Sequence, residues 1–589
     1  MYDDINDTQQ VNLELVPETN KTQTQPAVGK PASLGASVAV GVVAATLSAC
    51  GGAGSLGALP GIPAPTPTPT PTPTPLPNTI SANEAARFLF QAAMGAPRSE
   101  IANVQRLGYD GWLEAQFAMP ASETRWAWLV SQGYDVSTNK NTQQGFDSTT
   151  WRKLLISPDT LRQRIALTLS EILVVSVNGL AGIGWKAFAG AGYMDLLEAN
   201  CFGDYRTLLQ LISTSPAMGA YLTFRGNAKY NPTTGALPDE NYAREIMQLF
   251  SIGLQQLNLD GTPKLRNGAP IETYTQDDIS GLARIFTGWE FDFAGGNTNT
   301  PDYVRRSMTQ IPSRHETGAS SFLGSTVPAG LSGADALKMA LDAIFAHPNV
   351  APFISMQLIQ RLVTSNPSPA YVARVASVFN NDGKGVKGNL KAVIKAILLD
   401  VDARSAANLT NPVFGKIREP MLRFLAWARA FNANSSSNTW QLGDTSDPAT
   451  RLGQSPLRSP TVFNFFRPGY VPPNSSIANA NLTAPEFQIT NESSVVGYVN
   501  YMQTAVSRVS GINDVIGNYT SLLPLADDAA SLLDEFNTVL AAGQLSATTI
   551  GNLRNAVNTL PSGSDANRLR RIYAALTLVL AAPEFIVLK

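Results

Sequence analysis

Apolar residues recur at intervals of three and four positions along most of the chain after Ile80. In the segment 161–177 one stripe holds Leu161, Ile165, Leu169 and Ile172, which is the pattern of an amphipathic or largely buried helix. Comparable patterns occur at 83–94, 194–212, 334–345, 349–364, 370–379, 389–399, 419–431, 527–541 and 565–580. This periodicity predicts a predominantly all-α fold.

Strand-like alternation is confined to two short stretches, around 254–274 and 288–305. They predict one or two short β-hairpin excursions from the helical fold.

A length of 589 residues would by itself suggest about four domains. However, no segment within 80–589 has the composition of a linker, and no period of 20–50 residues repeats. We therefore predict one large multi-helix domain over 80–589.

Prolines occupy every second position from Pro65 to Pro75, and the pattern ends at Pro77. Each proline fixes φ and removes an amide donor, so neither a helix nor a sheet can form there. The run favours an extended polyproline-II spacer that rises about 3.1 Å per residue, or roughly 40 Å in all. The sequence therefore predicts a Pro-Thr stalk before the helical domain.

An uncharged, apolar run of 16 residues covers Leu34–Ala49. As a helix it would be about 24 Å long, shorter than the roughly 30 Å hydrocarbon core of a bilayer. A signal-peptide apolar region fits this length better than a membrane span does. The run leads directly into Cys50, and LSACG resembles the bacterial lipobox, whose cysteine is acylated and becomes the new N-terminus. The alternatives are an uncleaved anchor helix and a chance cysteine.

These features predict three parts in the chain. Residues 1–49 form a removable, disordered leader, although its acidic start departs from the short basic start of an ordinary signal peptide. Residues 50–79 form a lipidated N-terminus and linker, and 80–589 form the helical domain. The lipid on Cys50 would attach the protein to a membrane of the cell envelope, as an outer-membrane lipoprotein or at the cell surface.

Composition excludes several classes of function. The 43 basic and 45 acidic residues give no electrostatic case for binding nucleic acid. With only two histidines, a three-His zinc site is impossible, and we predict no metal site. Nucleophile-elbow, phosphate-loop and dinucleotide motifs are absent, and the sequence leaves the use of a cofactor unknown. Cys201 has no partner once Cys50 is acylated, and we expect it to be a buried packing residue.

Polar residues with catalytic potential gather in two segments. In the predicted helix that follows Pro238, Glu240 and Arg244 share a stripe and Glu245 lies alongside. A loop further on carries His315 and Glu316. These five residues are our candidates for acid/base catalysis. The alternatives are a helix-surface ion pair for the first group and a histidine bonded to backbone for the second.

Aromatic residues and an arginine crowd into the segment 463–470. Phe463, Phe466, Arg467 and Tyr470 would form a stacking platform for a sugar or a peptide if they are exposed. If they are buried, they hold a loop onto the helices.

Several segments resemble the successive motifs of the bacterial family called domain of unknown function 1800. They are ENYAREIMQLFSIGL, YTQDDISGLARIFTGW, RHETGASSFLG (314–324), GKIREP (415–420) and SPTVFNFFRPGYVPP (459–473). Further similar segments are ARFLFQAAMGAP (86–97), LRQRIALTLSEI (161–172), LKAVIKAILLD (390–400) and APEFQITNE (484–492). The resemblance implies a large exported bacterial protein, often encoded beside a second exported family that resembles sulfatases and phosphatases. It implies no activity.

Two hypotheses of function remain open. We favour an envelope-anchored accessory, assembly or binding protein for an exported partner, encoded nearby, or for an extracellular polymer. The alternative is an envelope-anchored hydrolase that cleaves an extracellular polymer through a carboxylate-based site.

Overall fold

The computed structural model describes residues 80–507 and 514–589. The predicted leader, the lipidation site at Cys50 and the Pro-Thr stalk all lie outside the described residues. Within them the predominantly α-helical fold is confirmed, and every strand belongs to a two-stranded antiparallel pair. None of the described helices is long and apolar enough to cross a bilayer.

The first helices surround α7, whose small residues let its neighbours approach closely. A side chain at Gly190 would overlap the Phe146 ring and Val177, so glycine is required where α7 meets these residues. Helices α4, α5, α6 and α9 all contact α7. This part of the chain contains α2 (Ala82–Ala92), α3 (Arg98–Ala118), α4 (Arg125–Ser131), α5 (Phe146–Ile156), α6 (Thr160–Ser170), α7 (Lys186–Asn200), α8 (Tyr205–Ser213) and α9 (Pro216–Tyr221).

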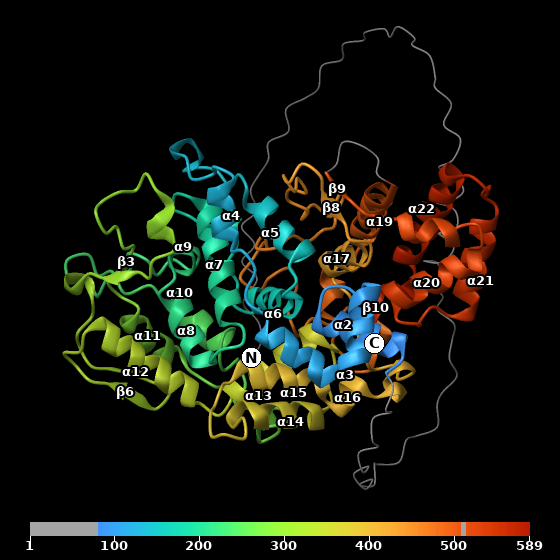
Figure 1. Cartoon of the computed structure of the whole chain (residues 1–589). Coiled ribbons are helices and arrows are strands. Elements are labelled where there is room, and N and C mark those ends of the chain that lie inside the picture. Colours follow the sequence, from blue (N-terminus) through green and yellow to red (C-terminus); the bar gives the residue numbers. More distant parts are fainter. Residues whose placement is uncertain (1–79, 508–513) are drawn as a thin grey trace, which may run out of the picture. The chain divides into compact units, whose positions relative to one another are not determined.

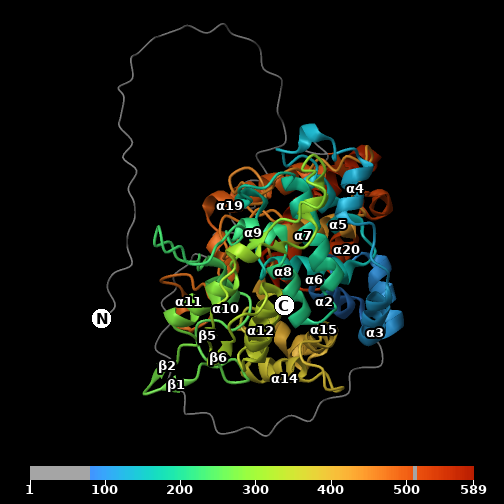
Figure 2. The same ribbon diagram turned by 90° about the vertical axis from the view of Figure 1, so that its left-hand side faces the viewer.

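The middle of the chain carries most of the hairpins. Helix α11 begins at a capping box between Thr275 and Asp278, and it packs on α10 and on β5 (Figure 2). The pairs β1–β2 and β3–β4 fall at or beside the predicted hairpins, and β5–β6 was not predicted. The elements are α10 (Asn241–Gln248), β1 (Leu265–Arg266), β2 (Ala269–Pro270), α11 (Gln276–Ile285), β3 (Trp289–Glu290), β4 (Thr309–Gln310), β5 (Ser320–Phe322) and β6 (Ser325–Val327).

A group of apolar helices follows, and α13 and α14 pack tightly together. The elements are α12 (Gly333–Ala346), α13 (Val350–Leu362), α14 (Pro369–Asn380), α15 (Leu390–Leu399), α16 (Val401–Arg404), β7 (Lys416–Ile417), α17 (Pro420–Ala430) and β8 (Asn434–Ser435).

The C-terminal elements return to the first described helix. Helix α2 packs on α20, strand β10 pairs with β7, and Arg87 Nε donates to the Lys589 carbonyl oxygen at 2.9 Å (Figure 1). The elements are α18 (Ser476–Asn479), α19 (Glu492–Ser507), β9 (Val515–Ile516), α20 (Ala529–Ala541), α21 (Ala547–Asn558), α22 (Asp565–Ala581), α23 (Pro583–Ile586) and β10 (Val587–Leu588).

Candidate functional site

Glu240 and Arg244 meet at the partly exposed edge between α10 and α11. Glu240 accepts hydrogen bonds from Ser280 Oγ at 2.6 Å and Gln276 Nε2 at 2.7 Å, and Arg244 lies 3.4 Å from the same carboxylate. The Glu240 carboxylate therefore links the two helices. A partly exposed ion pair of this kind is worth at most about 1 kcal/mol.

Glu245 is on the same helix but is buried. One of its carboxylate oxygens has no hydrogen-bond partner among the described residues. Burial raises the pKa of Glu245, and the charge of Arg244 only partly offsets this effect. Glu240 is thus partly exposed and hydrogen-bonded to α11, whereas Glu245 is buried and has one carboxylate oxygen without a hydrogen-bond partner among the described residues.

His315 and Glu316 lie at the other end of α11. His315 is buried, and its Nδ1 lies 3.2 Å from both the hydroxyl and the carbonyl oxygen of Thr287. Burial lowers the pKa of His315. Glu316 accepts from the Gly318 amide at 2.9 Å and lies 3.5 Å from Arg284, and the Gly318 bond is the main cause of its lowered pKa.

Four of the five candidates therefore form two groups at opposite ends of α11, and Glu245 joins neither group. Glu240 contacts Gln276 and Ser280 in the first half of this helix, whereas Glu316 contacts Arg284 in its last turn. No group of three or more His, Cys, Asp or Glu side chains within 80–507 and 514–589 is arranged to hold a metal ion.

The aromatic segment is partly exposed. The Arg467 guanidinium carbon lies 4.7 Å from the centre of the Phe463 ring, and Arg467 is exposed. Tyr470 is half-buried, while Phe466 is only 3% exposed and holds the segment to the core. The segment that carries Phe487 runs alongside this one, because the Ala484 amide donates to the Tyr470 carbonyl oxygen at 2.9 Å and the Arg467 amide donates to Gln488 Oε1 at 2.9 Å.

We call Phe463, Arg467, Tyr470, Val471 and Phe487 the aromatic patch. Val471 and Phe487 are 38% and 37% exposed, so both present apolar surface to solvent. Phe487 is an exposed neighbour from a separate family-like segment, 484–492.

A buried ionic cluster, which sequence reasoning did not single out, joins four distant parts of the chain. Lys416 Nζ lies 3.0 Å from Glu486 Oε1 and 3.5 Å from Glu419 Oε1. Arg361 Nε lies 3.7 Å from Glu171 Oε2, and the Arg361 carbonyl oxygen accepts from Lys416 at 2.9 Å. All five side chains are at most 5% exposed.

The carboxyl groups of this cluster differ in proton affinity. Burial, and then the nearby charge of Glu419, raise the pKa of Glu171 well above its usual value. Burial alone would raise the pKa of Glu419 too, but Lys416, Arg164 and a 2.6 Å hydrogen bond from Gln454 lower it. Both Glu171 carboxyl oxygens lack a hydrogen-bond partner among the described residues. Glu171 is therefore the member of the pair that holds a proton more readily.

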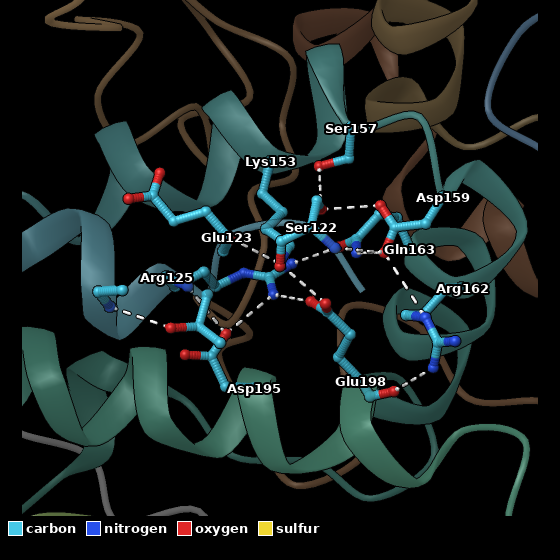
Figure 3. Close-up of polar contacts among 12 residues, drawn as sticks. Ser122, Glu123, Arg125, Lys153, Ser157, Asp159, Arg162, Gln163, Asp195 and Glu198 are labelled. Carbon is cyan, nitrogen blue, oxygen red and sulfur yellow. Dashed lines mark hydrogen bonds and ion pairs between the residues drawn. The ribbon is translucent and has the colours of Figure 1, made fainter. Parts of the chain in front are cut away.

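A second buried cluster connects α4, α5, α6 and α7 (Figure 3). Glu198 lies 2.7 Å from Arg125 and 2.8 Å from Lys153, so that one carboxylate faces two cations. Burial alone would raise the pKa of Glu198, but these two charges together lower it. Asp195 accepts from the backbone amides of Arg125 and Trp126, at 3.0 and 2.9 Å, and so caps the start of α4. Arg125, Lys153, Asp195 and Glu198 therefore have partners where the helices meet, and we assign these four ions to the packing of the helices.

Four of the five residues of the first cluster, all except Arg361, lie within segments that carry the family resemblance. Glu171 belongs to LRQRIALTLSEI, Lys416 and Glu419 belong to GKIREP, and Glu486 belongs to APEFQITNE. The only sign of this cluster in the sequence is that each of these segments carries charged residues beside apolar ones. That signal could not show that the three segments meet.

A family model described as "Protein of unknown function (DUF1800)" matches residues 87–587. The search of curated proteins gives no match. The search of solved structures gives none either.

Proposed function

This chain belongs to the family of proteins of unknown function DUF1800, and we propose that it is an exported, envelope-anchored lipoprotein that binds a partner. The partner would be an exported protein or an extracellular polymer, and the role that of an accessory, assembly or binding protein. The observation that carries this proposal is the aromatic patch.

The patch has the composition of a binding surface. Aromatic residues and arginine are enriched at protein interfaces, and they supply much of the binding energy. The Arg467 guanidinium is already stacked on Phe463, so less conformational freedom is lost when a partner covers it. Phe466 is buried and anchors the segment to the core of the protein. The patch is thus suited to hold a peptide segment or a sugar ring.

The envelope location rests on the leader and the stalk. A lipid on Cys50 would hold the body near the membrane, and a spacer of roughly 40 Å would let the patch reach a neighbouring molecule. We expect Cys50→Ser to move the protein from the membrane fraction to the soluble fraction.

Cross-linked pull-down from solubilised envelopes tests the binding function. We expect a stoichiometric partner with the native chain, and at least a tenfold loss of this partner with the double variant Arg467→Ala/Phe487→Ala. Leu265→Ala removes an apolar side chain that is 61% exposed in a different hairpin, and it should leave capture unchanged. Equal capture by all three proteins would contradict the role of the patch.

A hydrolase is the second candidate, and the different surroundings of two carboxyl groups favour it. Glu419 accepts from Gln454 at 2.6 Å and lies 3.5 Å from Lys416, while neither carboxyl oxygen of Glu171 has a hydrogen-bond partner among the described residues. A carboxyl group that keeps its proton can donate it to a leaving oxygen, while a neighbouring carboxylate accepts a proton from the attacking water. Both groups are buried, so a substrate would reach them only after local opening. Purified native chain and Glu419→Gln should then differ at least a hundredfold in hydrolysis of an envelope polysaccharide or peptide. Native chain without hydrolytic activity on either polymer would remove this candidate.

A further inference from the structure

A pocket of about 270 Å³ opens on the surface between residues 143–148 and residues 441–451. It is separate in sequence from the aromatic patch and from the catalytic candidates. Its volume lies near the lower end of the range for ligand pockets, and it matches one small polar unit rather than a long chain.

The walls of the pocket are held rigidly. Gly145 precedes α5 with φ of 86°, and a side chain there would overlap Leu129 and Tyr134. Trp440, which directly precedes the opposite wall at Gln441, has φ of 51°, a left-handed conformation that is costly for a bulky residue. The next residue, Gln441, donates its amide to Asp514 at 2.7 Å. The pocket is therefore formed before any ligand binds.

The hydrogen-bond acceptors of the lining are largely engaged within the protein. Both Asp147 carboxylate oxygens accept from Arg458, at 2.7 and 2.8 Å, and Gln143 Oε1 accepts from Arg458 at 2.9 Å. The Gly443 carbonyl oxygen accepts from Trp151 Nε1 at 3.2 Å. The Arg458 charge is shared between the carboxylates of Asp147, at 2.7 Å, and Asp444, at 3.4 Å.

The donors are less engaged, and Arg451 is the most important of them. Its Nη1 donates to the Leu442 carbonyl oxygen at 2.9 Å, and its charge lowers the pKa of the nearby Asp447 and opposes the raised pKa of Asp147. Among the described residues, the ion pairs beside this pocket are made by Arg458, with Asp147 and Asp444, and none is made by Arg451. The Ser148 hydroxyl and the exposed Gln144 amide lie in the same lining.

We propose that this pocket binds the carboxylate of a small polar unit, either a uronic acid or the C-terminal residue of a peptide. A guanidinium forms two parallel hydrogen bonds with a carboxylate, which makes Arg451 the main contact. The Gln144 side-chain amide and the Ser148 hydroxyl donate hydrogen bonds to the remaining oxygen atoms of the ligand. None of the described residues that line the pocket is aromatic, so they offer a neutral sugar no ring to stack on.

Isothermal titration of the detergent-purified full-length chain tests this proposal with two matched pairs of ligands. The first pair is D-glucuronate and D-glucose, and the second is N-acetylalanine and N-acetylalaninamide. We expect the acid of one pair to bind at least tenfold more tightly than its neutral counterpart, and the pair that shows this preference identifies the source of the carboxylate. If neither acid is preferred, the proposal is wrong.

Variants then locate the binding. Arg451→Gln should weaken binding of the preferred acid at least tenfold, and Arg451→Lys should restore part of it. Arg266→Gln removes an exposed arginine from strand β1, which has no part in the pocket or the aromatic patch, and should leave this affinity unchanged. If Arg451→Gln does not fold, as judged by circular dichroism, Ser148→Ala and Gln144→Ala serve in its place, each with an expected loss of threefold or more. Native affinity in the folded variants would overturn the assignment.

Discussion

The Lys416 ammonium lies 3.0 Å from the Glu486 carboxylate, and both side chains are buried. Since Lys416 also lies 3.5 Å from Glu419, one cation balances parts of two carboxylates that come from different segments. A buried charge that loses its partner is costly, because neither water nor another ion can compensate it.

Lys416→Met should therefore destabilise the protein by about 3–5 kcal/mol, because it leaves buried carboxylates without their counter-charge. The matched control is Lys338→Met. Lys338 lies 2.8 Å from Asp342, but these side chains are 70% and 47% exposed. Loss of such a surface pair should cost at most about 1 kcal/mol. Urea unfolding measures the loss of unfolding free energy in both variants. Equal losses would show that the buried pair stabilises the protein no more than a surface pair does.

Glu171 should make stability depend on pH. Because the folded-state pKa of Glu171 is raised, its contribution to stability is fully present below its unfolded pKa and is lost as pH rises through the folded value. Glu171→Gln cannot lose a proton, so its stability relative to the native chain should increase with pH over this window, by up to roughly 1.4 kcal/mol per pH unit. Urea unfolding between pH 4 and pH 8 provides the test. If the unfolding free energies of the native chain and of Glu171→Gln change with pH in parallel, the pKa of Glu171 is not raised.

The helical fold could be predicted because its signal is local. Several predicted segments agree closely with the structure, such as 389–399 with α15 and 565–580 with α22. The segment 161–177 was predicted as one helix, yet α6 ends at Ser170. The following residues 172–175 are apolar and buried without being helical, and a fully apolar run has no periodicity to mark the change.

Helix breaks were also harder to predict than helices. The pattern at 194–212 suggested one helix, but the structure has α7 and α8 with a break at residues 201–204. Asp204 accepts the Thr207 amide at 2.8 Å and starts α8 anew. An N-cap within a continuing apolar stripe is a weak signal beside the stripe itself.

The candidate site was predicted only where its residues are neighbours in sequence. Glu240 and Arg244 share a helix face, and the structure does bring them together. The cluster of Glu171, Lys416 and Glu486 depends on how distant segments pack. Periodicity gives the buried face of each segment, but it does not say which other segment covers that face.

Cys201 should be chemically inert in the folded protein. It is fully buried, and burial raises the pKa of its thiol to about 12, so almost no reactive thiolate exists at pH 8. In a Cys50→Ser variant Cys201 is the single thiol, and Ellman's reagent should label it only after unfolding in urea. Rapid labelling of the folded variant at pH 8 would contradict this burial.

Gly281 should tolerate no side chain, because α11 lies directly against strand β5. A Cβ atom at Gly281 would overlap the Ser321 carbonyl oxygen, and a backbone atom held in a β pair cannot move aside easily. We expect Gly281→Ala to destabilise the protein by about 1–3 kcal/mol. Gly551→Ala is the matched control, since this glycine lies within α21 and has open space around its Cβ position. Alanine should stabilise that helix by up to about 1 kcal/mol. Urea unfolding should therefore shift in opposite directions for the two variants, and a shift in the same direction would show that α11 can move away from β5.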